Sequence, residues 1–232
     1  MNTHSPAQIK TFLANWYLPV FMTRENKYPV GLMLGILATT LYLTSNHFHF
    51  FTPQLLPLSW VDTLVPFLPY TVWIYISEYV FFAVVYITCK DMVNLNKYFY
   101  SFLVLQSLSV LIFWVWPTTY PRELFPLTHD LDSVTYFTFN ALRNTDTPAN
   151  CCPSLHVSSV YLSAFIFLDD QKNKFPFFFI WGTAIAISTL TTKQHYLIDV
   201  VTGFMMAVTT YWIFHKYISY RPAYSSKRRK SK

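Results

Sequence analysis

Charged residues and glycines are scarce in this chain. Asp, Glu, Lys and Arg make up 12% of its 232 residues, about half of the roughly 25% found in soluble domains. Four residues are glycine, whereas 53% are hydrophobic and 20% are aromatic. This composition disfavours a soluble, sheet-rich domain and favours helices that lie in lipid.

Cysteine is also scarce, and we expect no cleavable secretion signal. Three cysteines do not make a disulfide framework. The adjacent pair Cys151 and Cys152 is poorly placed to form a bond within itself. The first 28 residues are polar and contain Arg24 and Lys27, so they lack the apolar core that a signal peptide needs.

Six apolar stretches approach the length of about 20 residues that a helix needs to cross a bilayer. Their expected limits are 29–48, 68–89, 97–116, 154–169, 174–192 and 195–217. The proline-rich stretch 51–69 predicts a loop with a short interfacial piece around Trp60–Phe67. The polar stretch 117–152 is too small and too rich in proline to fold alone. We therefore predict an all-α, polytopic membrane protein of one domain over 1–232.

Basic residues are distributed unevenly between the two sides of such a bundle. Six spans put both termini on one side, and 14 of the 17 Lys and Arg residues fall there, against Arg122, Arg143 and Lys193 on the other. The positive-inside rule then places 1–28 and 218–232 in the cytosol. We expect a multi-pass protein of a bacterial inner membrane or of a Golgi- or ER-type membrane.

The C-terminal tail carries seven of the 17 cationic residues in its last 17 positions. A basic cluster beside a membrane span favours contact with the anionic lipids of the cytosolic leaflet. Because the chain is polytopic, we do not expect nucleic acid as a partner.

Two histidines lie near the ends of predicted spans, His156 in Pro153–His156 and His195 in Gln194–Asp199. Ionisable side chains at membrane depth are costly and usually functional. The predicted topology places both histidines on the outer, non-cytosolic face. Histidine is suited to make and break a phosphoryl bond without a metal, as nucleophile or as acid and base. We therefore expect a membrane enzyme.

The spacing of the two motifs suggests separate roles. His195 and Asp199 are four residues apart, so a helix would place them on one face, where the carboxylate orients the imidazole as a nucleophile. Ser154 suits the first turn of a helix, whose free N–H groups bind phosphate. His156 would protonate the leaving group. Lys193 and Arg122 are the expected cations around the phosphate.

The motifs Pro153–His156 and Ser188–Asp199 resemble the second and third motifs of the type 2 phosphatidic acid phosphatase (PAP2) superfamily. Together with Asp62 and Pro66–Pro69, they are most similar to the branch of inositol phosphorylceramide synthases and related lipid phosphotransferases. The resemblance implies a PAP2-like helical bundle and a lipid phosphate or phospholipid substrate. It also implies a phosphohistidine at His195, which passes the phosphoryl group to water or to a lipid alcohol.

The chain departs from the phosphatase consensus at several positions. Leu155 stands where the consensus has glycine, Thr189 stands where it has arginine, and only Tyr120–Arg122 remains of the first motif. The sphingolipid-synthase branch is similar in lacking these features. The departures therefore favour transfer of a sphingolipid- or phosphoinositide-type headgroup over simple hydrolysis.

Other polar or small residues in the spans have less definite roles. Glu78 lies near the middle of the second span without an evident partner, and with Tyr196 it is a candidate for the lining of a substrate cavity. Gly31 and Gly35 form a GxxxG pattern in the first span, which is a helix-packing signal.

Two alternatives remain open from the residues alone. The first is a metal site made from His156, His195, Asp199 and Cys152, although the chain has neither CxxC nor HExxH spacing. We expect no metal and no other cofactor. The second is a non-enzymatic lipid transporter or scramblase on the same fold, because a fold alone does not fix a function.

Overall fold

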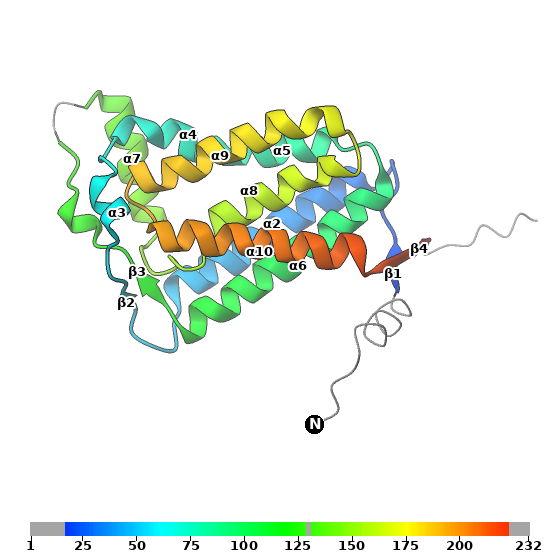
Figure 1. Ribbon diagram of the computed structural model, residues 1–232, viewed down its shortest axis with the longest axis horizontal. Coiled ribbons are helices and arrows are strands. Elements are labelled where there is room, and N and C mark those ends of the chain that lie inside the picture. The colour runs from blue at the N-terminus through cyan, green and yellow to red at the C-terminus, as the bar shows by residue number, and fades with distance from the viewer. Residues whose placement is uncertain (1–16, 129–130, 223–232) are drawn as a thin grey trace, which may run out of the picture.

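The computed structural model describes residues 17–128 and 131–222. Most of the predicted N-terminal segment and the cationic run of the C-terminal tail lie outside these residues. The described chain is almost entirely helical (Figure 1). Its longer helices are α2 (Lys27–His47), α5 (Glu78–Thr88), α6 (Met92–Val115), α7 (Ser133–Thr145), α8 (Leu155–Phe165), α9 (Phe175–Thr191) and α10 (Leu197–Lys216). The shorter ones are α3 (Trp60–Leu64), α4 (Val72–Ile76) and the 3-10 turns Pro69–Thr71, Arg122–Leu124, Ile166–Leu168 and Lys172–Lys174.

Five helical segments are long and apolar enough to cross a membrane. They are Lys27–His47, Pro69–Thr88, Met92–Val115, Lys172–Thr191 and Leu197–Lys216. Each corresponds to a predicted span, so the prediction of a polytopic helical membrane protein is confirmed. The predicted span 154–169 forms the shorter apolar helix Leu155–Leu168, which is only about 21 Å long at 1.5 Å per residue.

Helix α8 has no lipid-facing surface. Every residue of α8 is buried, and α5, α6, α9 and α10 all pack against it. Small side chains allow this close packing, and the hydroxyls of Ser159 and Ser163 are satisfied by donating to carbonyls one turn earlier, at 2.6 Å each. Gly203 of α10 is required for the contact, because a Cβ there would lie 2.5 Å from the carbonyl oxygen of Ser154.

The outer helices show the opposite pattern. In α2 the apolar side chains of Leu32, Met33 and Ile36 are all more than half exposed. Exposed apolar side chains along a whole helix are expected where the surrounding solvent is lipid.

The second predicted span is not one continuous helix. The α-helix is interrupted at Ser77, between α4 and α5. The Ser77 hydroxyl donates to the carbonyl of Ile74 at 2.6 Å and accepts from the indole N–H of Trp181 at 3.0 Å. Glu78 therefore becomes the first residue of α5, in the middle of the bundle.

The two ends of the bundle differ. At one end, β1 (Tyr17–Val20) pairs in parallel with β4 (Ser219–Pro222); we call this the β1–β4 end. At the other end lie α3, α7, β2 (Gln54–Leu55) and β3 (Thr118–Thr119) (Figure 1); we call it the α7 end. Sequence analysis did not predict α7.

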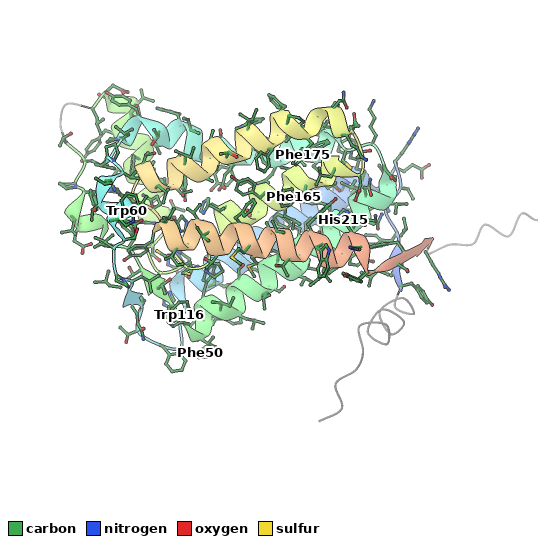
Figure 2. All side chains as sticks on the ribbon, viewed as in Figure 1. Phe50, Trp60, Trp116, Phe165, Phe175 and His215 are labelled. Atoms are coloured by element: carbon green, nitrogen blue, oxygen red, sulfur yellow. The ribbon has the colours of Figure 1, made fainter. Side chains whose placement is uncertain are left out.

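Large aromatic side chains are exposed at the α7 end. Figure 2 labels Trp60, Trp116 and Phe50 there, and their exposed fractions are 74%, 43% and 62%. The amphipathic ring of tryptophan is enriched at membrane–water interfaces, so the positions of Trp60 and Trp116 agree with an interface at this end of the bundle.

Candidate active site

His195 is held by acceptors on one side of its ring. Its Nδ1 lies 3.0 Å from the carbonyl oxygen of Cys151 and 3.3 Å from Oδ2 of Asp199. Because both partners are acceptors, Nδ1 carries the hydrogen and the lone pair is on Nε2. His195 lies in the turn before α10 rather than on the predicted helical face, whereas Asp199 lies in the first turn and also accepts from the Tyr196 backbone N–H at 2.8 Å.

His156 has different partners. Its Nε2 lies 3.0 Å from Oε1 of Glu78 and 2.7 Å from the hydroxyl of Tyr75. All three side chains are buried. The structure thus supplies a partner for Glu78, and Tyr75 is a site residue that sequence reasoning missed. The rings of His156 and His195 are 5.7 Å apart between centroids.

Ser154 joins the two histidine-bearing segments. Its backbone N–H donates to the carbonyl of Asp199 at 3.0 Å, and its hydroxyl caps α8 by accepting from the Val157 N–H at 3.3 Å. The start of α8 is therefore tied to the start of α10. This tie, with the close approach at Gly203, brings His156 and His195 together.

Lys193, expected to bind phosphate, is already bound within the protein. Its ammonium donates to the backbone carbonyls of Asp62 at 2.9 Å and Val65 at 2.5 Å, and it lies 5.0 Å above the ring of Phe125. Burial lowers the pKa of Lys193 below its ordinary value. The residue adopts a left-handed backbone conformation with φ of +56° in a tight turn. From this turn its side chain extends toward the end of α3 and the loop that follows it.

Arg122 is neutralised in a similar way. Its guanidinium contacts Asp146, with Nη2 3.3 Å from Oδ2 and Nη1 bound to the backbone carbonyl. The other carboxylate oxygen of Asp146 accepts from Tyr42 and from Asn46. In the described residues, no hydrogen bond connects Arg122 or Lys193 to either histidine.

A cavity of about 780 Å³ opens beside His156. It lies among α2, α5, α6, α7 and α8, and its walls are largely apolar. Glu78, His156 and Asp146 are the acidic and histidine side chains in its lining. His195 and Tyr196 are not part of the lining. The cavity therefore reaches the site from the side of His156.

A family model described as PAP2 superfamily matches residues 36–213. The chain belongs to the PAP2 superfamily. The predicted superfamily is confirmed, and the protein is a PAP2 enzyme of the phosphatase or phosphotransferase type. The matched residues include α4 to α9, both histidines and Asp199. Superfamily membership indicates lipid phosphates as the general substrate class. No curated protein and no solved structure matches the chain.

In this PAP2 enzyme, Tyr196 holds the segment between His195 and α10 in place. Its ring is fully buried against Tyr120, 4.6 Å away between centroids, and its hydroxyl donates to the carbonyl of Thr119 at 2.9 Å. Asp62 has a related role, because Oδ1 accepts from the Leu197 N–H at 2.7 Å and so ties α3 to the start of α10. Neither residue faces the cavity described above.

One group of side chains meets the distance requirement for a metal site. Ligand atoms of Cys151, His195 and Asp199 lie within 4.8 Å of one another, a set that differs from the one considered from sequence. Burial raises the pKa of the Cys151 thiol well above its ordinary value, and metals bind the thiolate. The thiol instead contacts the carbonyl of Pro148 at 3.3 Å. This chemistry does not favour metal binding.

Proposed function

We propose that this PAP2 enzyme transfers a phosphoryl-containing headgroup from a lipid through a phosphohistidine at His195. The observation that carries the proposal is the pairing of two nearby histidines with different partners. The free Nε2 of His195 would attack phosphorus, forming the N–P bond while the P–O bond to the leaving alcohol breaks. Asp199 would hold the tautomer and stabilise the positive imidazole.

His156 would act as the acid for the leaving oxygen. A proton passes from His156 to the alkoxide as it departs, and the second half-reaction returns a proton to His156 from the incoming water or alcohol. Glu78 supports this role, because its carboxylate lies 3.0 Å from the ring and balances the charge of the protonated imidazole. Tyr75 fixes the position of the ring.

The cavity supports the proposal that the alcohol which leaves or enters beside His156 is a lipid alcohol. Its mostly apolar walls suit an aliphatic chain, and its ionisable lining residues include Glu78 and His156. A chain in this cavity would place the oxygen of a leaving or accepting alcohol beside His156. A soluble phosphate ester would make no use of the cavity.

We propose that transfer is favoured over hydrolysis. The chain lacks the cations of the first phosphatase motif, and its remaining candidates Lys193 and Arg122 are bound to protein acceptors. A sphingolipid- or phosphoinositide-type headgroup donor and a lipid alcohol acceptor fit this arrangement, because the acceptor can use the same cavity as the leaving alcohol.

The site is proposed to face the non-cytosolic side of the membrane. The pairing of β1 with β4 puts both ends of the described chain at one end of the bundle. Five crossings would separate them, so α8 is proposed as the sixth. The histidines lie at the opposite, α7 end. The uneven distribution of basic residues then supports a cytosolic β1–β4 end and an outer site.

The test is a turnover assay with purified protein in detergent. A panel of lipid phosphates and phospholipid headgroup donors is incubated with ceramide-type acceptors, and products are identified by mass spectrometry. We expect headgroup transfer that His195→Ala abolishes and EDTA leaves unchanged. Equal turnover by the wild type and His195→Ala would refute the nucleophile. Activity lost with EDTA would instead support a metal mechanism, and lipid scrambling without turnover would support a transporter.

A further inference from the structure

Arg143 is the third basic residue assigned to the outer side, and it differs from the other two. Lys193 is bound by backbone carbonyls, and Arg122 is bound by Asp146 through Nη1 and Nη2, although Nε of Arg122 has no acceptor among the described residues. In Arg143, the Nε and Nη2 atoms are buried and have no hydrogen-bond acceptor among residues 17–128 and 131–222. Buried polar atoms in proteins are nearly always hydrogen-bonded, and a buried charge without a partner is costly.

The guanidinium of Arg143 is held in place without being neutralised. It lies over two aromatic rings, 4.8 Å from the centroid of Phe139 and 5.6 Å from that of Phe67. Burial and the neighbouring charge of Arg122 lower the pKa of Arg143 to about 10. The nearby carboxylate of Asp146 is already shared by Arg122, Tyr42 and Asn46. No ion pair joins Asp146 to Arg143 among the described residues.

Arg143 lies at the same end of the bundle as the two histidines. It is on α7, at the end of the bundle where α8 and α10 begin (Figure 1). Its neighbour Phe67 belongs to the loop that follows α3. In this loop, the carbonyl of Val65 accepts a hydrogen bond from Lys193, and the N–H of Leu68 donates to the carbonyl of Thr191 at 2.8 Å. Asp146, three residues after Arg143, lines the same cavity as His156.

We propose that Arg143 binds a phosphate oxyanion of the lipid headgroup and is the substrate-binding cation that the motif comparison did not identify. This inference rests on the proposed function for the identity of the ligand. A planar guanidinium with two free donor atoms matches two phosphate oxygens. Bound phosphate would satisfy Nε and Nη2 together and supply the missing negative charge.

The experiment measures anion binding separately from catalysis. The thermal unfolding midpoint of full-length protein in a neutral detergent is followed against inorganic phosphate, and in a second arm against phosphatidic acid in mixed micelles. The variants are Arg143→Gln, Arg143→Lys and the matched control Arg221→Gln. Arg221 also stacks on an aromatic ring, 4.7 Å from the Tyr17 centroid, but at the β1–β4 end.

We expect phosphate to raise the midpoint of the wild type and of Arg221→Gln. Arg143→Gln should bind phosphate roughly 10- to 100-fold more weakly, because hydrogen bonds to a charged group are lost, and Arg143→Lys should fall between. Stabilisation by phosphatidic acid alone would assign the site to an intact lipid headgroup, whereas stabilisation by both probes would assign it to the phosphate group itself.

A structural role predicts a different result. If Arg143 only stacks on Phe67 and Phe139, Arg143→Gln would lower the midpoint without phosphate and leave the phosphate affinity unchanged, which would refute the proposal. A His195→Asn arm separates the two proposals, because it removes the nucleophile and should keep Arg143-dependent phosphate binding. Turnover that survives in His195→Asn, with phosphate binding still lost in Arg143→Gln, would refute the phosphohistidine and leave the anion site standing.

Discussion

The two histidines are supported in different ways, and the difference indicates how the site divides its work. The His195 side is built from residues close in sequence and from backbone carbonyls, through Asp199 and Cys151. The His156 side is built from side chains about 80 positions away, Glu78 and Tyr75, and it borders the cavity. The first arrangement fixes an orientation. In the proposed mechanism, the second would supply a proton donor with a counter-ion and access for an apolar chain.

The largest expected effect is on the His195 side. His195→Asn keeps an amide donor near the position of Nδ1 and removes Nε2, the proposed attacking nitrogen, so turnover of every substrate should fall by roughly 10⁴-fold or more. The measurement is product formation under saturating lipid, with the thermal midpoint as a check on folding. A variant that retains a tenth of wild-type turnover would contradict a covalent role for His195.

Glu78→Gln tests the His156 side in a way that the first variant cannot. Loss of the counter-ion should lower turnover of alkyl lipid phosphates by roughly 10²- to 10⁴-fold, the usual contribution of general acid catalysis. An aryl phosphate, whose phenolate needs little protonation, should be affected far less. His195→Asn should be equally defective with both substrates. If Glu78→Gln also impaired both alike, Glu78 would not act through leaving-group protonation.

Gly203→Ala should disturb both sides at once. The new Cβ would lie 2.5 Å from the Ser154 carbonyl, so α8 and α10 must separate at a cost of about 1–3 kcal/mol. Unfolding in detergent measures this loss. Gly35→Ala is the matched control, because a Cβ there meets nothing within 4 Å and alanine is the better helix former. Equal stability of the two variants would contradict the close approach.

The smallest expected effect concerns chain length. Gly35 lines the cavity, and the lining residues of α2 extend from Tyr28 to Leu43, or roughly 22 Å at 1.5 Å per residue. Gly35→Leu should reduce turnover of long-chain substrates several-fold and spare short-chain ones. Competition between lipids of different chain length, read by mass spectrometry, gives the ratio. An unchanged preference would mean that the substrate chain lies elsewhere.

The partners of His195 could be predicted from the sequence more fully than the partners of His156. The spacing of His195 and Asp199 is local, and the pairing follows from four residues of chain. The pairing of Glu78 with His156 depends on how α5 packs on α8 and on the break at Ser77. Neither this packing nor the break at Ser77 has a signal in the local sequence, beyond the presence of an acidic residue in an apolar span.

The expected cations show the same limit. Lys193 and Arg122 could be placed at the right end of the bundle from topology, but their partners could not. Lys193 is bound by carbonyls of a loop about 130 positions away, and Arg122 by Asp146, which follows an amphipathic helix that sequence reasoning did not predict. The GxxxG pattern was interpreted as helix packing, and Gly31 of α2 does pack closely against Tyr86 of α5, whereas Gly35 borders the cavity.

The burial of α8 on every side also bears on how the protein is made. With a length below the roughly 20 residues of a membrane span and three serines among its residues, α8 is a weaker membrane span than its neighbours. Two of its neighbours, α9 and α10, are synthesised after it. The surroundings that bury α8 are therefore complete only after those two helices have been made. The ribosome has to complete α10 before His156 and His195 can meet, so a truncated or stalled chain would carry no premature phosphotransfer activity.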